Sequence, residues 1–196
     1  MKSLIKNVIL ILIPFSKQYL EFRKTGQKSS YFAFFKFKTG ISKIPFPVEK
    51  GCQVAHYKRV KIGINCLVTR PGNYIQAVGG VEIGDYVQFG PNVGILSTNH
   101  DLYDQREYNH KKVIIGDYSW VGMNSVVLPG VELGKRTIVA AGSVVTKSFP
   151  EGYCVIGGNP AKKIKELDPE KFIPWKGEVE YYGFIPKNKL KNKDLK

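Results

Sequence analysis

The stretch Ile115–Pro150 reads, in blocks of six, IGDYSW, VGMNSV, VLPGVE, LGKRTI, VAAGSV and VTKSFP. Every block opens on an aliphatic residue, namely Ile115, Val121, Val127, Leu133, Val139 and Val145. The second place is Gly or Ala in four of the six blocks, and the fifth place is small or branched in five. A strand repeats every two residues and an α-helix about every 3.6, so a period of six belongs to neither.

A six-residue period predicts a parallel β-helix. Three blocks form one triangular coil, the opening aliphatic side chain points into the prism, and small residues let the chain bend at the corners. Successive coils stack by parallel pairing at about 4.8 Å per layer. A weaker register precedes the stretch, with an interruption at 70–73, and is carried by Ile62, Val68, Ala77, Ile83, Phe89 and Ile95.

One segment breaks this register. The step from Ile95 to Ile115 is twenty residues, which is three hexads plus two. The segment 96–114 is polar and holds two of the three histidines of the chain. Insertions into solenoids fall on one face and often carry the function, so we predict a loop insertion at 96–114.

The N-terminal segment carries a broken apolar run, Leu4–Phe15. Its uninterrupted part, Val8–Ile13, is far shorter than the roughly 20 residues that span a bilayer. No small-residue cleavage site follows it, which argues against a signal peptide. We expect a helix within 1–24 that packs on the first coil or on an oligomer of the prism. The alternative is a helix that lies in the membrane interface.

The segments flanking the repeats are predicted to close the two ends of the prism. Residues 25–60 are turn-rich and aromatic and should cap the first coil, because an open end would expose an unpaired edge. After Pro150 we expect one last strand at Tyr153–Ile156 and a short basic helix at Ala161–Leu167. The expected organisation is all-β with helical caps: an N-terminal helix and capping segment at 1–60, a β-helix domain at 61–167 and a basic tail at 168–196.

Charge is concentrated in the flanks. The chain has a formal net charge of +14, of which +8 falls in residues 1–50, +2 in 51–159 and +4 in 160–196. Basic flanks around a near-neutral core suit a membrane surface or another polyanion, and solvated lysines fit equally well. Cys52, Cys66 and Cys154 are far apart and form no CxxC pair. Such sparse cysteines indicate a reduced cytoplasmic protein without a zinc site or a disulfide framework.

Among the histidines, His100 is the candidate for catalysis. It follows Ser97-Thr98-Asn99, directly after a repeat strand, where the coil still fixes the backbone. A neutral imidazole can take a proton from a hydroxyl or an amine near neutral pH. The competing interpretation is an ordinary loop histidine, and this is the interpretation we favour for His56 and His110.

From about Ile62 to Leu167 the chain resembles the hexapeptide-repeat acyltransferases, in the branch of the maltose, galactoside and capsular-sugar O-acetyltransferases. The motifs that carry the resemblance follow in the family's order: Gly90-Pro91-Asn92-Val93, Thr98-Asn99-His100, the segment 115–122 (IGDYSWVG), the segment 141–147 (AGSVVTK) and Gly158-Asn159-Pro160-Ala161. Together they span over half of the chain. They are specific for the superfamily and less so for the sugar-acetylating branch.

The resemblance implies direct acetyl transfer from acetyl-CoA to a hydroxyl, with no metal and no acyl-enzyme. His100 would be the general base. A backbone N–H near Gly122-Met123 would meet the oxyanion that develops during acyl transfer. Relatives often have Ser where Met123 stands, so a hydroxyl contribution is missing at that position.

The resemblance also implies a coenzyme A site. Trp120 would form a flat apolar wall for the pantetheine arm, and backbone groups at Gly122 and Ala141 would hold its amides. The phosphates and adenine would meet Thr146, Lys147, Lys162 and Lys165. Relatives often have Arg at the last two positions, and Lys keeps the charge but loses the planar fork. Taken singly, each of these residues is also compatible with an ordinary surface role.

The residues that would bind the acceptor are less well defined. Asn73 and Gln76 could line a hydroxyl-rich pocket near His100, although turn and strand-surface roles fit them equally well. Asp101 could orient the imidazole or bind the acceptor, and the alternative is a solvated acidic loop.

Three other functions remain to be weighed. A zinc carbonic anhydrase on this fold needs three histidines on one metal, and the steps of 44 and 10 residues between His56, His100 and His110 do not match that pattern. A non-catalytic scaffold would be indifferent to loss of His100. N-acylation of an amino sugar uses the same machinery, and the sequence does not separate it from O-acetylation.

The family resembled has a left-handed β-helix and forms homotrimers with active sites between prisms. We therefore expect His100 of one subunit to face Trp120 of its neighbour. The expected acceptor is a saccharide or a glycan of a capsule, exopolysaccharide or lipopolysaccharide, and no nucleic-acid partner is expected. The expected location is the cytoplasm, with membrane contact through the N-terminal helix as an alternative.

Overall fold

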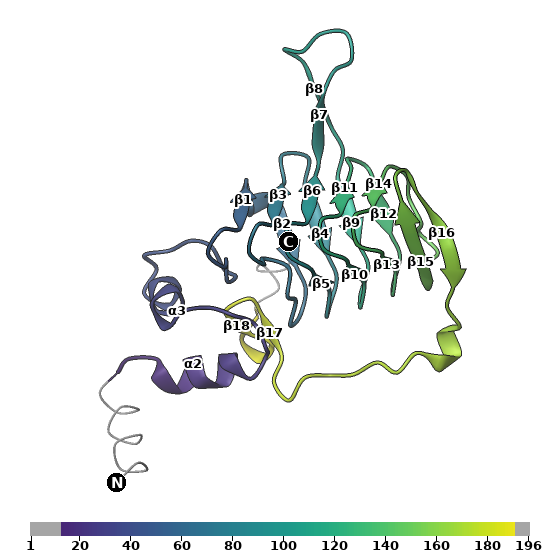
Figure 1. The fold of residues 1–196 in the computed structure, drawn as a ribbon. Helices are drawn as coiled ribbons and strands as arrows, with labels where there is room; N and C mark the ends of the chain where they lie inside the picture. The colour runs from purple at the N-terminus through teal and green to yellow at the C-terminus, as the bar shows by residue number, and fades with distance from the viewer. Residues whose placement is uncertain (1–12, 191–196) are drawn as a thin grey trace.

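The computed structural model describes residues 13–190, which form a parallel β-solenoid with two helices at its N-terminal end (Figure 1). Three parallel sheets make the faces of the prism. The β6 face contains β1 (Gln53–Ala55), β3 (Tyr74–Gln76), β6 (Gly94–Leu96), β11 (Val126–Val127) and β14 (Val144–Val145). The β9 face contains β2 (Val60–Ile62), β4 (Val81–Ile83), β9 (Val113–Ile115) and β12 (Glu132–Leu133).

The third sheet, the β10 face, contains β5 (Gln88–Phe89), β10 (Trp120–Val121), β13 (Ile138–Val139), β15 (Cys154–Gly158) and β16 (Ala161–Glu166). Each coil runs from the β9 face to the β10 face and then to the β6 face, as in β9, β10 and β11. The predicted parallel β-helix and its hexad register are confirmed.

The opening aliphatic residue of each hexad points into the prism. Ile115 pairs with Leu133 across the β9 face, and Val121 pairs with Val139 across the β10 face. The six side chains that open the hexads are all at most 1% exposed: Ile115, Val121, Val127, Leu133, Val139 and Val145. Burial of such side chains contributes about 1.5–3 kcal/mol each relative to leaving them exposed.

The glycine in the second place of the hexad is needed because successive coils approach closely at one corner. A Cβ on Gly63 would overlap the backbone of Gly84 and the carboxylate of Asp85, and a Cβ on Gly84 would overlap Asp117. The carboxylates in turn join the coils: Ile64 N donates to Asp85 Oδ1 at 2.7 Å, and Asp85 N donates to Asp117 Oδ1 at 2.8 Å. The Gly-Asp pair of the repeat is therefore a coil-to-coil clamp.

The small polar residues in the fifth place bond the corner backbone. The hydroxyl of Ser125 donates to Ala140 O at 3.0 Å and accepts from Ser143 N at 3.3 Å. Ser143 continues the ladder, because its Oγ donates to Ala140 O at 2.6 Å and accepts from Gly158 N at 3.2 Å. Buried corner groups thus have partners, as a close-packed interior requires.

The two ends of the chain meet beside the first coils. Helices α2 (Ser16–Arg23) and α3 (Tyr31–Lys38) pack on the hairpin of β17 (Tyr181–Tyr182) and β18 (Ile185–Pro186). The shared core is aromatic, with Phe22 at 5.3 Å from Phe184 and 5.8 Å from Tyr181 between ring centroids. Figure 1 shows the tail running from β16 back along the prism to this cluster.

The tail is attached to the prism by aromatic contacts on its way. Phe172 meets the ring of Tyr118 at 5.1 Å, and Trp175 meets that of Tyr86 at 5.0 Å. Phe172, Trp175 and Tyr181 thus attach the tail to the prism and to the N-terminal helices.

One prediction about the flanks was wrong. Ala161–Leu167 was expected to be a helix, but 161–166 form strand β16, antiparallel to β15. The last coil leaves β15 with an unpaired edge, and an antiparallel strand satisfies its backbone groups where a helix would not. The turn-rich lead-in contains helix α3, which Ser30 caps by accepting from Ala33 N at 3.1 Å. Its aromatic residues gain burial against the hairpin, which outweighs weak helix propensity.

The apolar run Leu4–Phe15 lies mostly outside the described residues, so its packing or membrane contact stays a prediction. Within 13–190, no helix is long and apolar enough to cross a membrane.

The Asp85 carboxylate gives the fold a testable pH dependence. Burial raises the pKa of this carboxyl above its usual range, and the hydrogen bond from Ile64 N offsets the effect only in part. The folded state therefore holds the proton more tightly than the unfolded chain, and stability falls as the pH rises above about 4. Asp85→Asn keeps an acceptor for Ile64 N without the charge. We expect its urea midpoint to match wild type near pH 4 and to exceed it at pH 7.

Asp85→Ala serves as the control, because it removes the acceptor and should cost about 1–3 kcal/mol at both pH values. An Asn variant that is less stable than wild type at pH 7 alone would contradict this account of the corner.

Candidate functional site

The predicted insertion contains a β-hairpin, 98–110, that projects from the prism, while the ends of the range 96–114 belong to β6 and β9 (Figure 1). Strands β7 (Thr98–His100) and β8 (Tyr108–His110) pair antiparallel, with His100 opposite Tyr108. Lys111 N donates to Ser97 O at 2.9 Å and closes the base of the hairpin. Gly79 N donates to Ser97 Oγ at 2.9 Å and joins that base to the preceding coil. The hairpin therefore rises from the corner between the β6 and β9 faces, which we call the hairpin edge.

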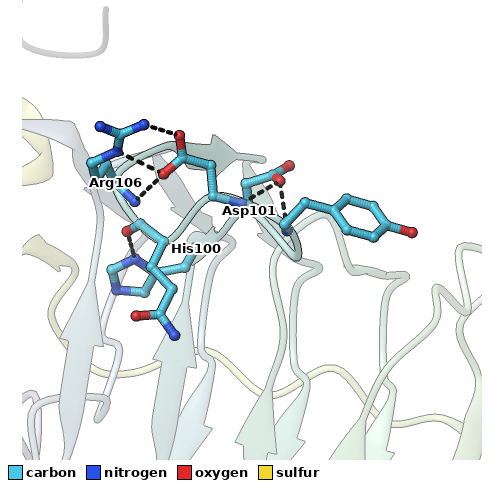
Figure 2. A network of polar contacts seen from close by, with 6 residues as sticks. His100, Asp101 and Arg106 are labelled. Carbon is cyan, nitrogen blue, oxygen red and sulfur yellow. Dashed lines mark hydrogen bonds and ion pairs between the residues drawn. The ribbon is translucent and has the colours of Figure 1, made fainter.

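His100 is oriented by a backbone carbonyl. Its Nδ1 lies 2.6 Å from Gln105 O across the hairpin tip (Figure 2). A carbonyl oxygen can only accept, so Nδ1 carries the proton and the neutral ring leaves Nε2 as the acceptor. The ring of Tyr108 packs on the imidazole with centroids 4.5 Å apart. His100 thus presents a base-competent nitrogen from a fixed position.

Asp101 shapes the hairpin tip and does not orient the imidazole, which corrects one alternative for this residue. Its Oδ1 accepts from Tyr103 N at 2.9 Å and from Asp104 N at 3.2 Å (Figure 2). Its Oδ2 accepts from Asn109 Nδ2 at 3.1 Å. These bonds, that of Tyr103 foremost, lower the pKa of the Asp101 carboxyl. Both oxygens of the Asp101 carboxylate are engaged at the hairpin tip, and the partner of His100 Nδ1 is Gln105 O instead.

Asp104 and Arg106 complete the tip. The guanidinium donates to both carboxylate oxygens, at 2.9 Å from Nε and 2.8 Å from Nη2 (Figure 2). This bidentate pair lowers the pKa of the Asp104 carboxyl. It joins the residues on either side of Gln105, whose carbonyl oxygen accepts from His100 Nδ1. Sequence reasoning missed Gln105, because a backbone carbonyl is present at every residue and only the hairpin register singles one out.

The other two histidines stay apart from this arrangement. His110 is exposed and its Nδ1 lies 2.6 Å from Thr98 Oγ1, while His56 is exposed at the start of a short turn. In the described part of the chain, no group of three His, Cys, Asp or Glu side chains could hold a metal ion.

A second set of predicted site residues lies on the β10 face. In its register, Trp120 is opposite Ile138, Ile138 is opposite Val155, and Val155 is opposite Lys165. Trp120 is 52% exposed. The outer surface of this face is therefore an apolar row with an indole near one end and a lysine at the other. The cationic end comes from β16, the strand that was predicted to be a helix.

The corner between the β10 and β6 faces, which we call the Ala141 edge, holds Gly122 and Ala141. A Cβ on Gly122 would lie 2.5 Å from Ala141 N, so only glycine allows this approach. Gly122 N is bonded to Val139 O at 2.8 Å, whereas the N–H groups of Met123 and Ala141 have no partner in residues 13–190. Both residues are exposed, and Lys162 lies opposite Gly157 in the same region.

Thr146 and Lys147 lie on the hairpin edge, away from the rest of the predicted coenzyme A set. They follow β14 where the chain leaves the β6 face, and neighbouring Ser148 Oγ donates to Gly130 O at 3.4 Å. Gly130 in turn lies against the side chain of Lys111 at the hairpin base. One chain therefore places His100, Thr146 and Lys147 on one edge and Trp120 and Ala141 around another.

Asn73, which directly precedes β3, and Gln76, its last residue, were predicted to bind the acceptor. Their side-chain amides differ in hydrogen bonding. Asn73 is 1% exposed, and its amide donates to Val68 O and accepts from Val93 N, each at 2.9 Å. It holds the coil together and cannot reach an acceptor, so that prediction is wrong. Gln76 is half-buried, and its Oε1 has no hydrogen-bond partner in the described chain. The Gln76 oxygen is therefore unpaired but buried, and it is not exposed to an acceptor in the described chain.

Comparisons with known proteins agree with this architecture. The family model described as "Bacterial transferase hexapeptide (six repeats)" matches residues 112–147. The galactoside O-acetyltransferase of Lactococcus lactis is 40% identical over 96 residues, which cover 47% of this chain and 46% of that protein. That of Escherichia coli K12 is 35% identical over 92 residues, covering 45% of each. The chain thus spans about half the length of these curated relatives.

Two solved structures extend the likeness. A maltose O-acetyltransferase from Clostridium difficile is 31% identical with a TM-score of 0.57, covering 62% of this chain and 66% of that one. A hexapeptide-repeat acetyltransferase of Vibrio cholerae complexed with acetyl coenzyme A is 25% identical with a TM-score of 0.60, covering 74% and 86%. By its repeat, its fold and these relatives, the chain is similar to the hexapeptide-repeat acetyltransferases, the maltose and galactoside O-acetyltransferases among them.

Proposed function

We propose that this protein is an acetyl-CoA-dependent O-acetyltransferase that acts on a sugar hydroxyl. The observation that carries the proposal is the bond between His100 Nδ1 and Gln105 O at 2.6 Å. It fixes the tautomer in which Nε2 is the base, and it does so on a hairpin that stands clear of the prism. Relatives named as galactoside and maltose O-acetyltransferases supply the substrate class.

The reaction follows from that base. His100 Nε2 takes the proton of the sugar hydroxyl as its oxygen attacks the thioester carbonyl of acetyl-CoA. The tetrahedral intermediate then collapses with cleavage of the C–S bond, and the imidazolium returns the proton to the departing thiolate. Gln105 O stabilises the imidazolium by keeping its bond to Nδ1–H.

The oxyanion of the intermediate needs a donor that the coil does not already use. Gly122 N is bonded to Val139 O, so the proposal narrows to Met123 N–H, which is free in the described chain. Backbone donors of this kind typically contribute about 2.7–4 kcal/mol to transition-state stabilisation. Because this donor is a main-chain N–H, it is present although the side chain at position 123 is that of Met.

Acetyl-CoA is assigned to the β10 face and the Ala141 edge. The pantetheine arm would lie along the apolar row from Trp120 toward Lys165, with amide contact at the free Ala141 N–H. Lys162, Lys165 and Lys147 form no ion pair with any residue of 13–190, so their charges are available to phosphates. The Vibrio cholerae relative is a complex with acetyl coenzyme A.

The division of these residues between two edges supports a site shared by neighbouring subunits. In one chain the hairpin edge offers His100, Thr146 and Lys147, and the β10 face offers the surface for the pantetheine arm. A cyclic trimer would bring the hairpin edge of one prism to the β10 face of the next, three times over. We therefore extend the proposal to a homotrimer whose active sites lie between prisms.

The base assignment is tested by His100→Ala. Removal of a general base should lower the rate of acetyl transfer by about 10²–10⁴-fold, because the hydroxyl must then lose its proton to water. Thiol release from acetyl-CoA, measured against a panel of sugars and oligosaccharides, reports the rate. His110→Ala is the matched control, since His110 is an exposed histidine of the same hairpin. Equal loss in both variants, or no loss in His100→Ala, would overturn the assignment.

The shared site is tested first by mass. We expect light scattering of the purified full-length protein to give three times the 22.1 kDa of one chain. A monomer that retains acetyl transfer would contradict the placement of the site between prisms.

A further inference from the structure

A groove of roughly 560 Å³ lies on the outer side of β2 and β4, on the β9 face. Its walls come from both ends of the chain. The N-terminal lead-in contributes Phe46, and the C-terminal hairpin and the turn after it contribute Tyr182, Ile185 and Leu190. The flanking segments thus build the groove on the regular prism.

The groove is basic. Five cations line it against two carboxylates, Glu82 and Asp85. Glu82 is shared by two lysines, with Oε1 at 3.4 Å from Lys61 Nζ and 3.2 Å from Lys112 Nζ. Asp85 is occupied by Ile64 N at the coil corner.

Two of the remaining cations are free. Lys43 and Lys58 are exposed and have no ion-pair partner among residues 13–190, whereas Arg59 donates to Val78 O. A groove that combines free amines with aromatic and aliphatic walls suits a ligand with anionic groups and broad apolar faces.

The groove begins at the base of the hairpin that carries His100. Gly80 and Lys112 line its edge, and Gly80 O accepts from Val113 N at 3.1 Å. Ser97 accepts a hydrogen bond from Gly79, the neighbour of Gly80, and it directly precedes β7. His100 is three strand residues further on, which is on the order of 10 Å. A chain of a few sugars would reach from the groove to the imidazole.

We propose that this groove binds the acidic part of the acceptor, which is a saccharide carrying carboxylate or phosphate groups. A sugar ring face packs on Tyr182, the anionic groups meet Lys43 and Lys58, and a hydroxyl of an adjoining sugar reaches His100. Lysines serve as point charges for either anion, so uronic acids and phosphorylated sugars share the site. This inference rests on the proposed function and adds the chemical class of its acceptor.

The test compares wild type with the double variant Lys43→Gln and Lys58→Gln, both as full-length protein. Calorimetric titration uses three probes without acetyl-CoA: an oligogalacturonate, a sugar phosphate, and a neutral maltooligosaccharide matched in length to the first. We expect the variant to bind an acidic probe about tenfold more weakly, and wild-type binding of that probe to weaken with added salt. The probe that binds identifies the anion as carboxylate or phosphate.

A second double variant, Lys171→Gln and Lys176→Gln, removes two exposed lysines of the tail and should bind like wild type. Acidic probes that bind equally to all three proteins, or that do not bind better than the neutral one, would overturn the groove assignment. Thiol release is measured in parallel. If an acidic probe binds through Lys43 and Lys58 but no acetyl transfer occurs, the groove assignment stands and the proposed function is wrong. If acetyl transfer occurs and the groove variant has an unchanged KM, the proposed function stands and the groove assignment is wrong.

Discussion

The structure depends on the close approach of successive coils at the glycine corners. Gly63 and Gly84 leave no room for a Cβ, and the carboxylates of Asp85 and Asp117 fill that space and accept backbone N–H groups from the preceding coil. The residue after each Asp then takes a left-handed turn, with φ of 58° at Tyr86 and 57° at Tyr118. The close approach of glycine continues at Gly116 and Gly134, which meet the backbone of the following coil, and it keeps the three faces in register.

Function is assigned to the places where this regularity stops. The hairpin replaces a corner turn, and its position follows from Ser97 and Lys111, which still belong to the coil. The β10 face ends on β16, which carries Lys162 and Lys165 where another coil would otherwise stack. The tail returns along the prism to the N-terminal helices and so closes one wall of the basic groove. A rigid prism with a few irregular attachments is suited to positioning groups, since loops on regular scaffolds often carry chemistry.

The hexad period was enough to predict the prism, its inward-facing residues and the location of the insertion. It could not predict β16, because AKKIKEL satisfies a short helix as well as a strand, and only the open edge of β15 decides between them. Asn73 and Gln76 look alike as amides three residues apart, yet the coil uses both amide groups of the first and leaves an oxygen of the second free. The partner of His100 is a carbonyl, which no side-chain pattern encodes. Local pattern therefore fixes the scaffold, and tertiary pairing decides the site.

The central claim is that His100 of one subunit serves acetyl-CoA bound on the β10 face of its neighbour, and subunit mixing tests it most directly. His100→Ala and the double variant Trp120→Ala with Lys165→Ala should each be inactive alone. Co-expressed in equal amounts, they should recover about a quarter of wild-type acetyl transfer, because three in four random trimers are mixed and each has one intact site of three. Mixed trimers, verified by mass, that show no more activity than either parent would contradict the shared site.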